Sequence, residues 1–70
     1  SGDLQKGVEA YKKGDYATAL KEWTLLAEGG DAKAQTMLGI MFSAGKGIPK
    51  DYKKAVKWYT LAAKQGNAQA

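Results

Sequence analysis

The side chains that carry out most of the chemistry in proteins are missing from this chain. Its 70 residues include no cysteine and no histidine, and all eleven basic residues are lysines. Without these residues, disulfides and thiolate zinc sites are excluded, and the commonest general base and metal ligand are absent. The carboxylates do not stand at a spacing suited to paired acid–base catalysis. We predict no catalytic residue, no metal site and no cofactor, and therefore no enzyme.

One glycine-rich segment, Ser43-Ala44-Gly45-Lys46-Gly47, superficially resembles a phosphate-binding loop. Three features argue against that function. Gly39 and Gly45 are separated by five residues instead of four, and Gly47 stands where serine or threonine is required. The segment also follows a predicted helix instead of a strand. A turn whose glycines adopt positive φ is the better interpretation.

The lysines gather in the second part of the chain. Residues 46–70 hold six lysines and one acid, Asp51, whereas residues 1–45 hold five lysines and six acids. Because clustered cations attract polyanions, nucleic acid is a candidate partner. It is the weaker candidate, since arginine is absent and the lysines of residues 52–64 spread around a helix instead of forming a strip.

The overall composition is that of one small folded domain. Hydrophobic residues make up 44% of the chain and charged residues 26%, which is typical of globular proteins. No stretch approaches the roughly 20 apolar residues of a membrane span, and no signal peptide is evident. Ser1-Gly2 looks like a cleavage remnant. The compartment is therefore left open, and a periplasmic or secreted location would follow from a signal peptide in a longer parent chain.

An internal repeat organises the sequence. Residues 15–34 laid over residues 51–70 match at ten of twenty positions. The segments before these blocks correspond at an offset of 32 instead of 36, which indicates a four-residue insertion in a loop. We predict a first repeat over about 3–30 and a second over about 31–66, with its longer turn at 45–51. Residues 67–70 are interpreted as the start of a truncated third repeat.

Helix signals recur with the same period. Four segments each follow an aspartate, a favoured N-cap residue, and each is followed by glycine, which is common where helices end. The spacing predicts helices at roughly 4–12, 16–28, 32–44 and 52–64, and no strand. The four aspartates are Asp3, Asp15, Asp31 and Asp51, and the glycines are Gly14, Gly29-Gly30, Gly45 and Gly66.

The helix faces predict how the elements pack. The third helix is apolar almost all round, so we expect it to pack on more than one side. Gly39 in its middle predicts the close passage of another backbone. We expect Met37 and Met41 to fill gaps in the core, and Trp58 to cover the junction with a following repeat. An apolar stripe on the fourth helix comprises Tyr52, Ala55, Val56, Tyr59, Ala62 and Ala63.

These residues resemble a known pattern. The second unit is similar throughout to the Sel1-like repeat, a close relative of the tetratricopeptide repeat, except that Phe42 stands where that family has tyrosine. The first unit resembles the tetratricopeptide version, although Gly7-x-x-Ala10 departs from its usual aromatic. The matching residues are Ala34-Gln35-x-x-Leu38-Gly39-x-x-Phe42-x-x-Gly45-x-Gly47-Ile48-x-x-Asp51-x-x-x-Ala55-x-x-Trp58-Tyr59-x-x-Ala62-Ala63-x-Gln65-Gly66.

The resemblance implies an all-α fold, an α-solenoid of two stacked antiparallel helix–turn–helix repeats, and a role as adaptor or scaffold. In such stacks the first helix of each unit lines a concave surface suited to a peptide or helix of a partner protein. The side chains on that face that core packing does not use are the groove candidates: Val8, Lys12, Lys33, Thr36, Ile40 and Ser43. The structural repeat positions are Leu38, Gly39, Phe42, Gly45, Gly47, Ala55, Trp58, Tyr59, Ala62, Ala63 and Gly66.

The fourth helix raises a question of self-association. Roughly three or more repeats are normally required for a stable solenoid. Two units and a fragment leave an unfilled apolar end near Trp58 and Leu61. We therefore expect that a homodimer, or exchange of helices between chains, could cover this end.

Overall fold

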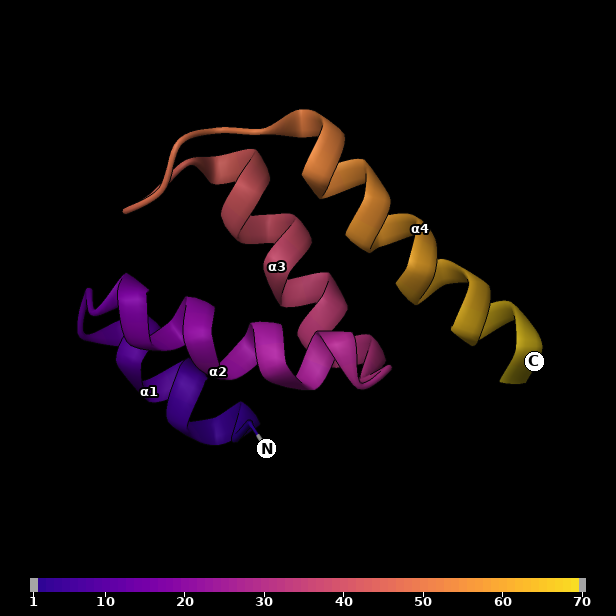
Figure 1. The fold of residues 1–70 in the computed structure, drawn as a ribbon, viewed down its shortest axis with the longest axis horizontal. Coiled ribbons are helices and arrows are strands. Elements are labelled where there is room, and N and C mark those ends of the chain that lie inside the picture. Colours follow the sequence, from indigo (N-terminus) through magenta and orange to yellow (C-terminus); the bar gives the residue numbers. More distant parts are fainter. Residues whose placement is uncertain (1, 70) are drawn as a thin grey trace.

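The chain is all α-helical. A computed structural model describes residues 2–69, with side chains described for residues 2–66. It contains four helices, α1 (Leu4–Lys12), α2 (Tyr16–Glu28), α3 (Ala32–Ala44) and α4 (Tyr52–Gln69), and the described residues form no strand. Figure 1 shows α1 antiparallel to α2 and α3 antiparallel to α4, with α3 between α2 and α4. The two stacked hairpins confirm the predicted fold class.

All four helices begin where the sequence predicts. The carboxylate of each preceding aspartate accepts a hydrogen bond from the backbone N–H three residues later, at 3.0, 3.2, 2.9 and 3.0 Å in chain order. Each carboxylate thereby satisfies one of the free amides of a first helical turn. The N-cap prediction is confirmed at every helix.

Glycine ends the first three helices. Gly14, Gly30 and Gly45 have φ values of 83°, 102° and 68°, in the left-handed region where glycine has no steric cost. The residue after each of the first two glycines donates a backbone hydrogen bond to a carbonyl in the last turn of the helix. Asp15 N–H donates to the Ala10 carbonyl at 2.8 Å, and Asp31 N–H donates to the Leu26 carbonyl at 3.0 Å. The predicted helix ends at residues 12, 28 and 44 are confirmed.

The predicted end of the fourth helix is wrong. Gly66 lies inside α4, which continues to Gln69. Gly66 does not have the positive φ of Gly14, Gly30 and Gly45, so it lacks the left-handed conformation that ends a helix. A Cβ atom at Gly66 would meet nothing within 4 Å. Residues 67–69 therefore extend α4 in this structure and Ala70 lies outside the described residues. That residues 67–70 start a third repeat stays a prediction.

The core lies along α2 and α3. Its buried side chains are mostly small and come from α1, α2 and α3, with Leu38 and Met41 the largest that are fully buried. Helix α3 contacts both α2 and α4, as expected from a helix that is apolar nearly all round. Ala55 adds a buried residue from α4. The core cluster consists of Ala10, Ala19, Trp23, Ala27, Ala34, Leu38 and Met41.

A glycine facing an aromatic ring holds each hairpin close. A Cβ atom at Gly7 would overlap the indole of Trp23, and one at Gly39 would overlap the ring of Tyr59. The two glycines correspond in the internal repeat, and so do the two aromatics. A close approach at Gly39 was predicted, but the neighbour is the Tyr59 ring and not the backbone that was expected. The first repeat has the corresponding contact.

The packing of α4 differs from the prediction. Of its apolar stripe, Ala55 is buried and Ala62 half-buried, but Tyr52 and Val56 are both 62% exposed and Ala63 is exposed as well. The described helices cover only one side of α4, so most of the stripe has no neighbour. Trp58 is half-buried and packs against the core, and its place at a junction with a following repeat stays a prediction.

Two glutamine side chains fix α4 to the turn between α2 and α3. Gln35 is buried and donates to the Ala27 carbonyl at 3.2 Å. Its amide oxygen accepts from Nε2 of Gln65 at 3.0 Å, and the same nitrogen lies 2.6 Å from the Gly30 carbonyl. The network satisfies a polar group inside the core and sets the position of α4 beside α3.

Within the part of the chain described, no helix is long and apolar enough to cross a membrane.

Candidate partner-binding groove

A cavity of about 240 Å³ opens between α1 and α3, with α2 as its floor. Its wall presents no polar atom, although a lysine is among its residues. The lysine therefore contributes its methylene stem while its ammonium group stays in water. The cavity is lined by Val8, Tyr11, Lys12, Trp23, Met37 and Ile40.

Trp23 forms the fixed base of this groove. Its side chain is 2% exposed, and its indole N–H donates to the Leu4 carbonyl at 3.2 Å. The Tyr11 ring lies against it with 5.7 Å between ring centroids. Because Gly7 has no side chain, α1 can approach the indole closely. Sequence, helix spacing and ring packing together give the groove a rigid floor.

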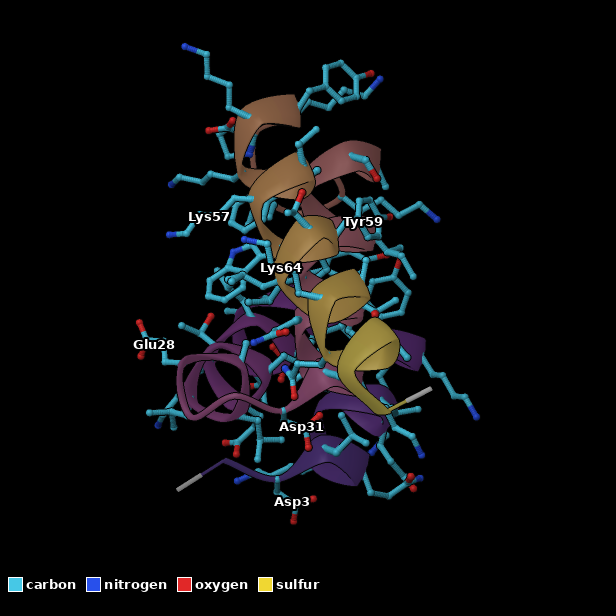
Figure 2. All side chains as sticks on the ribbon, turned by 90° about the vertical axis from the view of Figure 1, so that its right-hand side faces the viewer. Asp3, Glu28, Asp31, Lys57, Tyr59 and Lys64 are labelled. Atoms are coloured by element: carbon cyan, nitrogen blue, oxygen red, sulfur yellow. The ribbon has the colours of Figure 1, made fainter. Side chains whose placement is uncertain are left out.

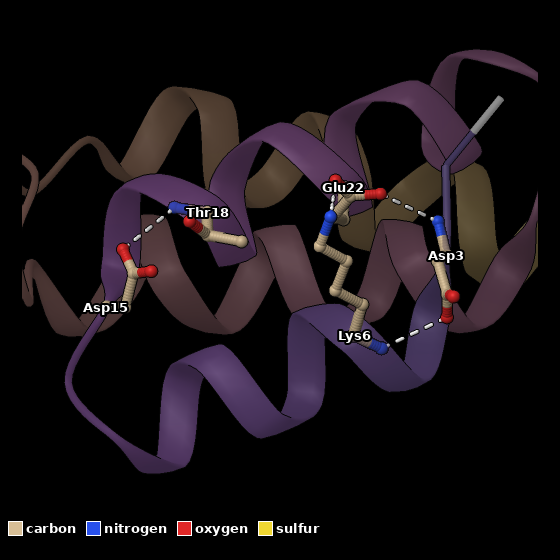
Figure 3. Close-up of polar contacts among 5 residues, drawn as sticks. All are labelled: Asp3, Lys6, Asp15, Thr18 and Glu22. Carbon is tan, nitrogen blue, oxygen red and sulfur yellow. Dashed lines mark hydrogen bonds and ion pairs between the residues drawn. The ribbon is translucent and has the colours of Figure 1, made fainter.

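A buried carboxylate holds α1 in place. Glu22 on α2 accepts a hydrogen bond from the Asp3 N–H at 3.0 Å, and its other oxygen lies 3.8 Å from the ammonium of Lys6 (Figure 3). A buried carboxylate is costly unless it is paired, so this contact ties the start of α1 to α2. It thereby fixes the α1 wall of the groove, a role that the sequence pattern did not indicate.

The structure brings three of the six groove candidates together. Val8, Lys12 and Ile40 line the cavity, and Ile40 is 40% exposed. Lys33, Thr36 and Ser43 do not line it. They lie at helical spacing with Ile40 on α3, and the two hydroxyls donate to backbone carbonyls within α3, at 3.0 Å from Thr36 and 3.1 Å from Ser43.

Three lining residues were not among the candidates. The sequence pattern did not indicate Tyr11 or Trp23 as groove residues, and Met37 was expected to fill a gap in the core. Met41 does so and is fully buried, whereas Met37 is only half-buried. The sequence did contain an indication for Tyr11, because it lies three residues after Val8 and therefore on the same face of the helix.

A larger depression on the opposite side of α1 is lined mainly by charged and polar residues. It measures about 490 Å³, and its residues include Asp3, Glu9 and Asp15. Asp3 and Asp15 cap helices, and Glu9 accepts a hydrogen bond from Gln5 at 3.1 Å. The side chain of Thr18 and then its backbone N–H hold the pKa of Asp15 below its ordinary value. These carboxylates already have helix-capping or intrahelical partners, which disfavours the depression as a binding site.

A third cavity, of about 220 Å³, lies where α4 meets α2 and α3. Two lysines fold over its aromatic rings, with the Lys54 ammonium 5.3 Å from the centre of Phe42 and that of Lys57 5.0 Å from Trp58. Figure 2 shows Lys57 and Tyr59 on opposite sides of α4. Lys54 and Lys57 line this one cavity, and Lys53, Lys57 and Lys64 recur at helical spacing on one face of α4. The expectation that these lysines spread around the helix is therefore wrong.

The residues described contain no group of three or more His, Cys, Asp or Glu side chains placed to hold a metal ion. The distinguishing features of the groove between α1 and α3 are its shape and its apolar wall. The cavity is apolar, and the indole beneath it is held by its hydrogen bond to the Leu4 carbonyl.

Comparisons with known proteins agree with this geometry. A family model described as Sel1 repeat matches residues 32–67, about half of the chain. A stretch of 50 residues is 42% identical to rat DAP3-binding cell death enhancer 1 and 41% identical to the mouse protein of that name, covering 71% of this chain and 10% of each relative. The chain thus spans about a tenth of these relatives' length, and no solved structure matches it significantly. The chain belongs to the Sel1 repeat family, whose tetratricopeptide-like helical repeats are protein–protein interaction modules.

Proposed function

We propose that this chain is an adaptor module that binds a peptide or helix of a partner protein in the groove between α1 and α3. The observation that carries the proposal is the apolar cavity over Trp23, which offers a partner side chain a preformed pocket. Shallow apolar pockets with a fixed aromatic base are typical places where interface anchors dock. The Sel1 repeat family supports a scaffold role, since its members are typically not enzymes.

The matched relatives support the class of function but do not identify the partner. The rat and mouse proteins are named for binding DAP3, another protein. Because this chain covers only a tenth of their length, its own partner is left unspecified. Nucleic acid or another polyanion, bound through the lysines of residues 46–70, is the alternative, and the test below distinguishes it.

Affinity capture from a lysate of the source cell tests the proposal. The bait is the chain itself, beside a Lys12→Glu, Ile40→Asp groove variant. A matched control is Lys21→Glu, Leu25→Asp on α2, because Leu25 is 44% exposed, close to the 40% of Ile40, and neither control residue lines the groove. Thermal melts first establish that all three proteins are folded.

The adaptor proposal expects a protein that the chain and the α2 control retain and the groove variant loses. Retention that disappears after nuclease treatment would favour the polyanion alternative. A protein held equally by all three baits would contradict the groove as the binding site.

The exposed face of α4 supports a second proposal, that two chains associate through it. Tyr52 and Val56 are each 62% exposed and Tyr59 is 38% exposed, and the three recur at helical spacing on one face of α4. Exposed apolar side chains gathered on one element often mark an interface. A homodimer, or an exchange of helices, would remove them from water, and the oligomeric state in solution tests it.

A further inference from the structure

The cavity over Trp23 has the size and chemistry to hold one apolar side chain. Its volume of about 240 Å³ is below the roughly 300–1,000 Å³ of small-molecule sites. The single indole N–H beneath it is already bonded to the Leu4 carbonyl, and the wall presents no other polar atom. A polar group placed there would lose its hydrogen bonds to water without replacement.

The rim of the groove is positively charged. Lys12 lines the cavity and is exposed, and Lys33 lies on α3 four residues before Met37 and seven before Ile40, so it shares their side of the helix. No carboxylate lines the cavity. Among the side chains described for residues 2–66, the one ion pair seen joins Lys6 to Glu22 at the other side of α1. The groove therefore presents cations that its own chain does not neutralise.

The charge also argues against a second copy as occupant of this groove. The exposed apolar residues of α4, Tyr52 and Val56, are flanked in the sequence by Lys53 and Lys57. Seating that helix in the groove would bring like charges together, which is unfavourable. An acidic partner segment would instead gain attraction at the rim while it buries its apolar anchor.

We infer that the groove selects a partner segment in which one large apolar side chain is flanked by aspartate or glutamate. The apolar side chain fills the cavity over Trp23, and the acidic neighbours pair with Lys12 and Lys33. This inference rests on the proposed function, because it specifies the partner of the same groove. It adds the anchor and the sign of charge that the partner must carry.

Selection from a displayed library of random peptides tests the inference on the intact chain. Peptides are selected on the chain and then sorted by loss of binding to Ile40→Gln, a groove variant that changes no charge. The sorted peptides are next measured against Lys12→Glu, with Lys21→Glu on α2 as the matched control. Ile40 and both lysines are exposed, so we expect the variants to fold, and a thermal melt checks each one.

The inference expects groove-dependent peptides with an apolar anchor beside acidic residues. Their binding should weaken roughly 3- to 10-fold with Lys12→Glu, change less than about 2-fold with Lys21→Glu, and decline as salt is raised. Groove-dependent peptides with neutral or basic flanks, or with no response to Lys12→Glu, would overturn the inference and leave the proposed function standing. Peptides that bind Ile40→Gln as well as they bind the chain would overturn both.

Discussion

Gly7 and Trp23 form the residue pair on which the groove most directly depends. The indole is buried, its N–H is bonded to Leu4, and the space for it exists because residue 7 has no side chain. A single methyl group at this position would have to displace either a ring or a helix. The shape of the groove is therefore sensitive to the smallest possible substitution.

We predict that Gly7→Ala lowers the free energy of unfolding by ~1–3 kcal/mol through overpacking. The sign of this change in the free energy of unfolding is informative, because alanine in a helix is normally favoured over glycine by about 1 kcal/mol. Gly66→Ala is the matched control: Gly66 is also helical but has nothing within 4 Å of its missing Cβ. Its substitution should be stabilising by up to about 1 kcal/mol. Urea unfolding measures both, and stabilisation by both would contradict the contact with Trp23.

Asp51 provides a second prediction at the scale of one residue. Its carboxylate accepts a hydrogen bond from the Lys54 N–H at 3.0 Å and begins α4. Asp51→Ala should cost about 1 kcal/mol of stability, while Asp51→Asn keeps an acceptor and should cost only a few tenths. Thermal and urea melts give both values. Equal stability of the alanine variant and the original chain would show that the cap contributes nothing.

At the scale of the helices, packing relies on alanines at their contacts. Ala19, Ala27, Ala34 and Ala55 are at most 2% exposed, which allows neighbouring helices to approach closely. Ala55 is the buried apolar residue that joins α4 to the rest of the molecule. The contact between α3 and α4 therefore tests whether the second hairpin is packed as described.

We predict that Ala55→Leu destabilises the chain by ~1–3 kcal/mol, because the added atoms have no space at this contact. Ala63→Leu is the matched control, since Ala63 lies on the same helix and is exposed. It should change stability by less than about 0.5 kcal/mol. Urea unfolding compares the two, and a tolerated Ala55→Leu would refute close packing of α3 and α4.

The helices were predictable where the determining signal is local. Caps at Asp3 or Asp51, and the turn at Gly14, depend on residues within one helical turn, so the sequence alone places them. The course of α4 through Gly66 was not predictable, because a helical glycine and a terminating one look alike until the neighbouring elements are known.

The groove residues, too, were predictable only where a local pattern indicates them. Helical spacing identified Val8, Lys12 and Ile40 from single faces of α1 and α3. Trp23 and Met37 required knowledge of which helices meet and at what depth. A repeat-matched aromatic indicates a core position equally well whether it is enclosed on every side or forms the floor of an open pocket.

At the scale of the whole molecule, the two hairpins leave one side of α4 uncovered. In the internal repeat α4 corresponds to α2, whose equivalent face is covered by α3. By that correspondence, a helix like α3 would fit against Tyr52, Val56 and Tyr59. The exposed stripe of α4 is the expected consequence of two units without a third packed on it.

We predict that appending a second copy of residues 31–66 after residue 66 raises the melting temperature at every protein concentration. The added unit would bury the stripe of the original α4, while its own last helix repeats that stripe, so any dependence of the melting temperature on concentration should persist in both proteins. Differential scanning calorimetry at several concentrations compares the two proteins. No gain in stability from the added unit would contradict the repeat correspondence.

Mapping the residues that a bound partner contacts would test the groove between α1 and α3 directly. Backbone amide signals of the isotope-labelled chain would be followed by nuclear magnetic resonance while a groove-selected peptide or the captured partner segment is added. Binding in the groove should give the largest shifts on the facing sides of α1 and α3, at Val8, Tyr11, Lys12, Met37 and Ile40. Shifts confined to α4, whether at its lysines or at Tyr52 and Val56, would contradict a partner-binding groove between α1 and α3.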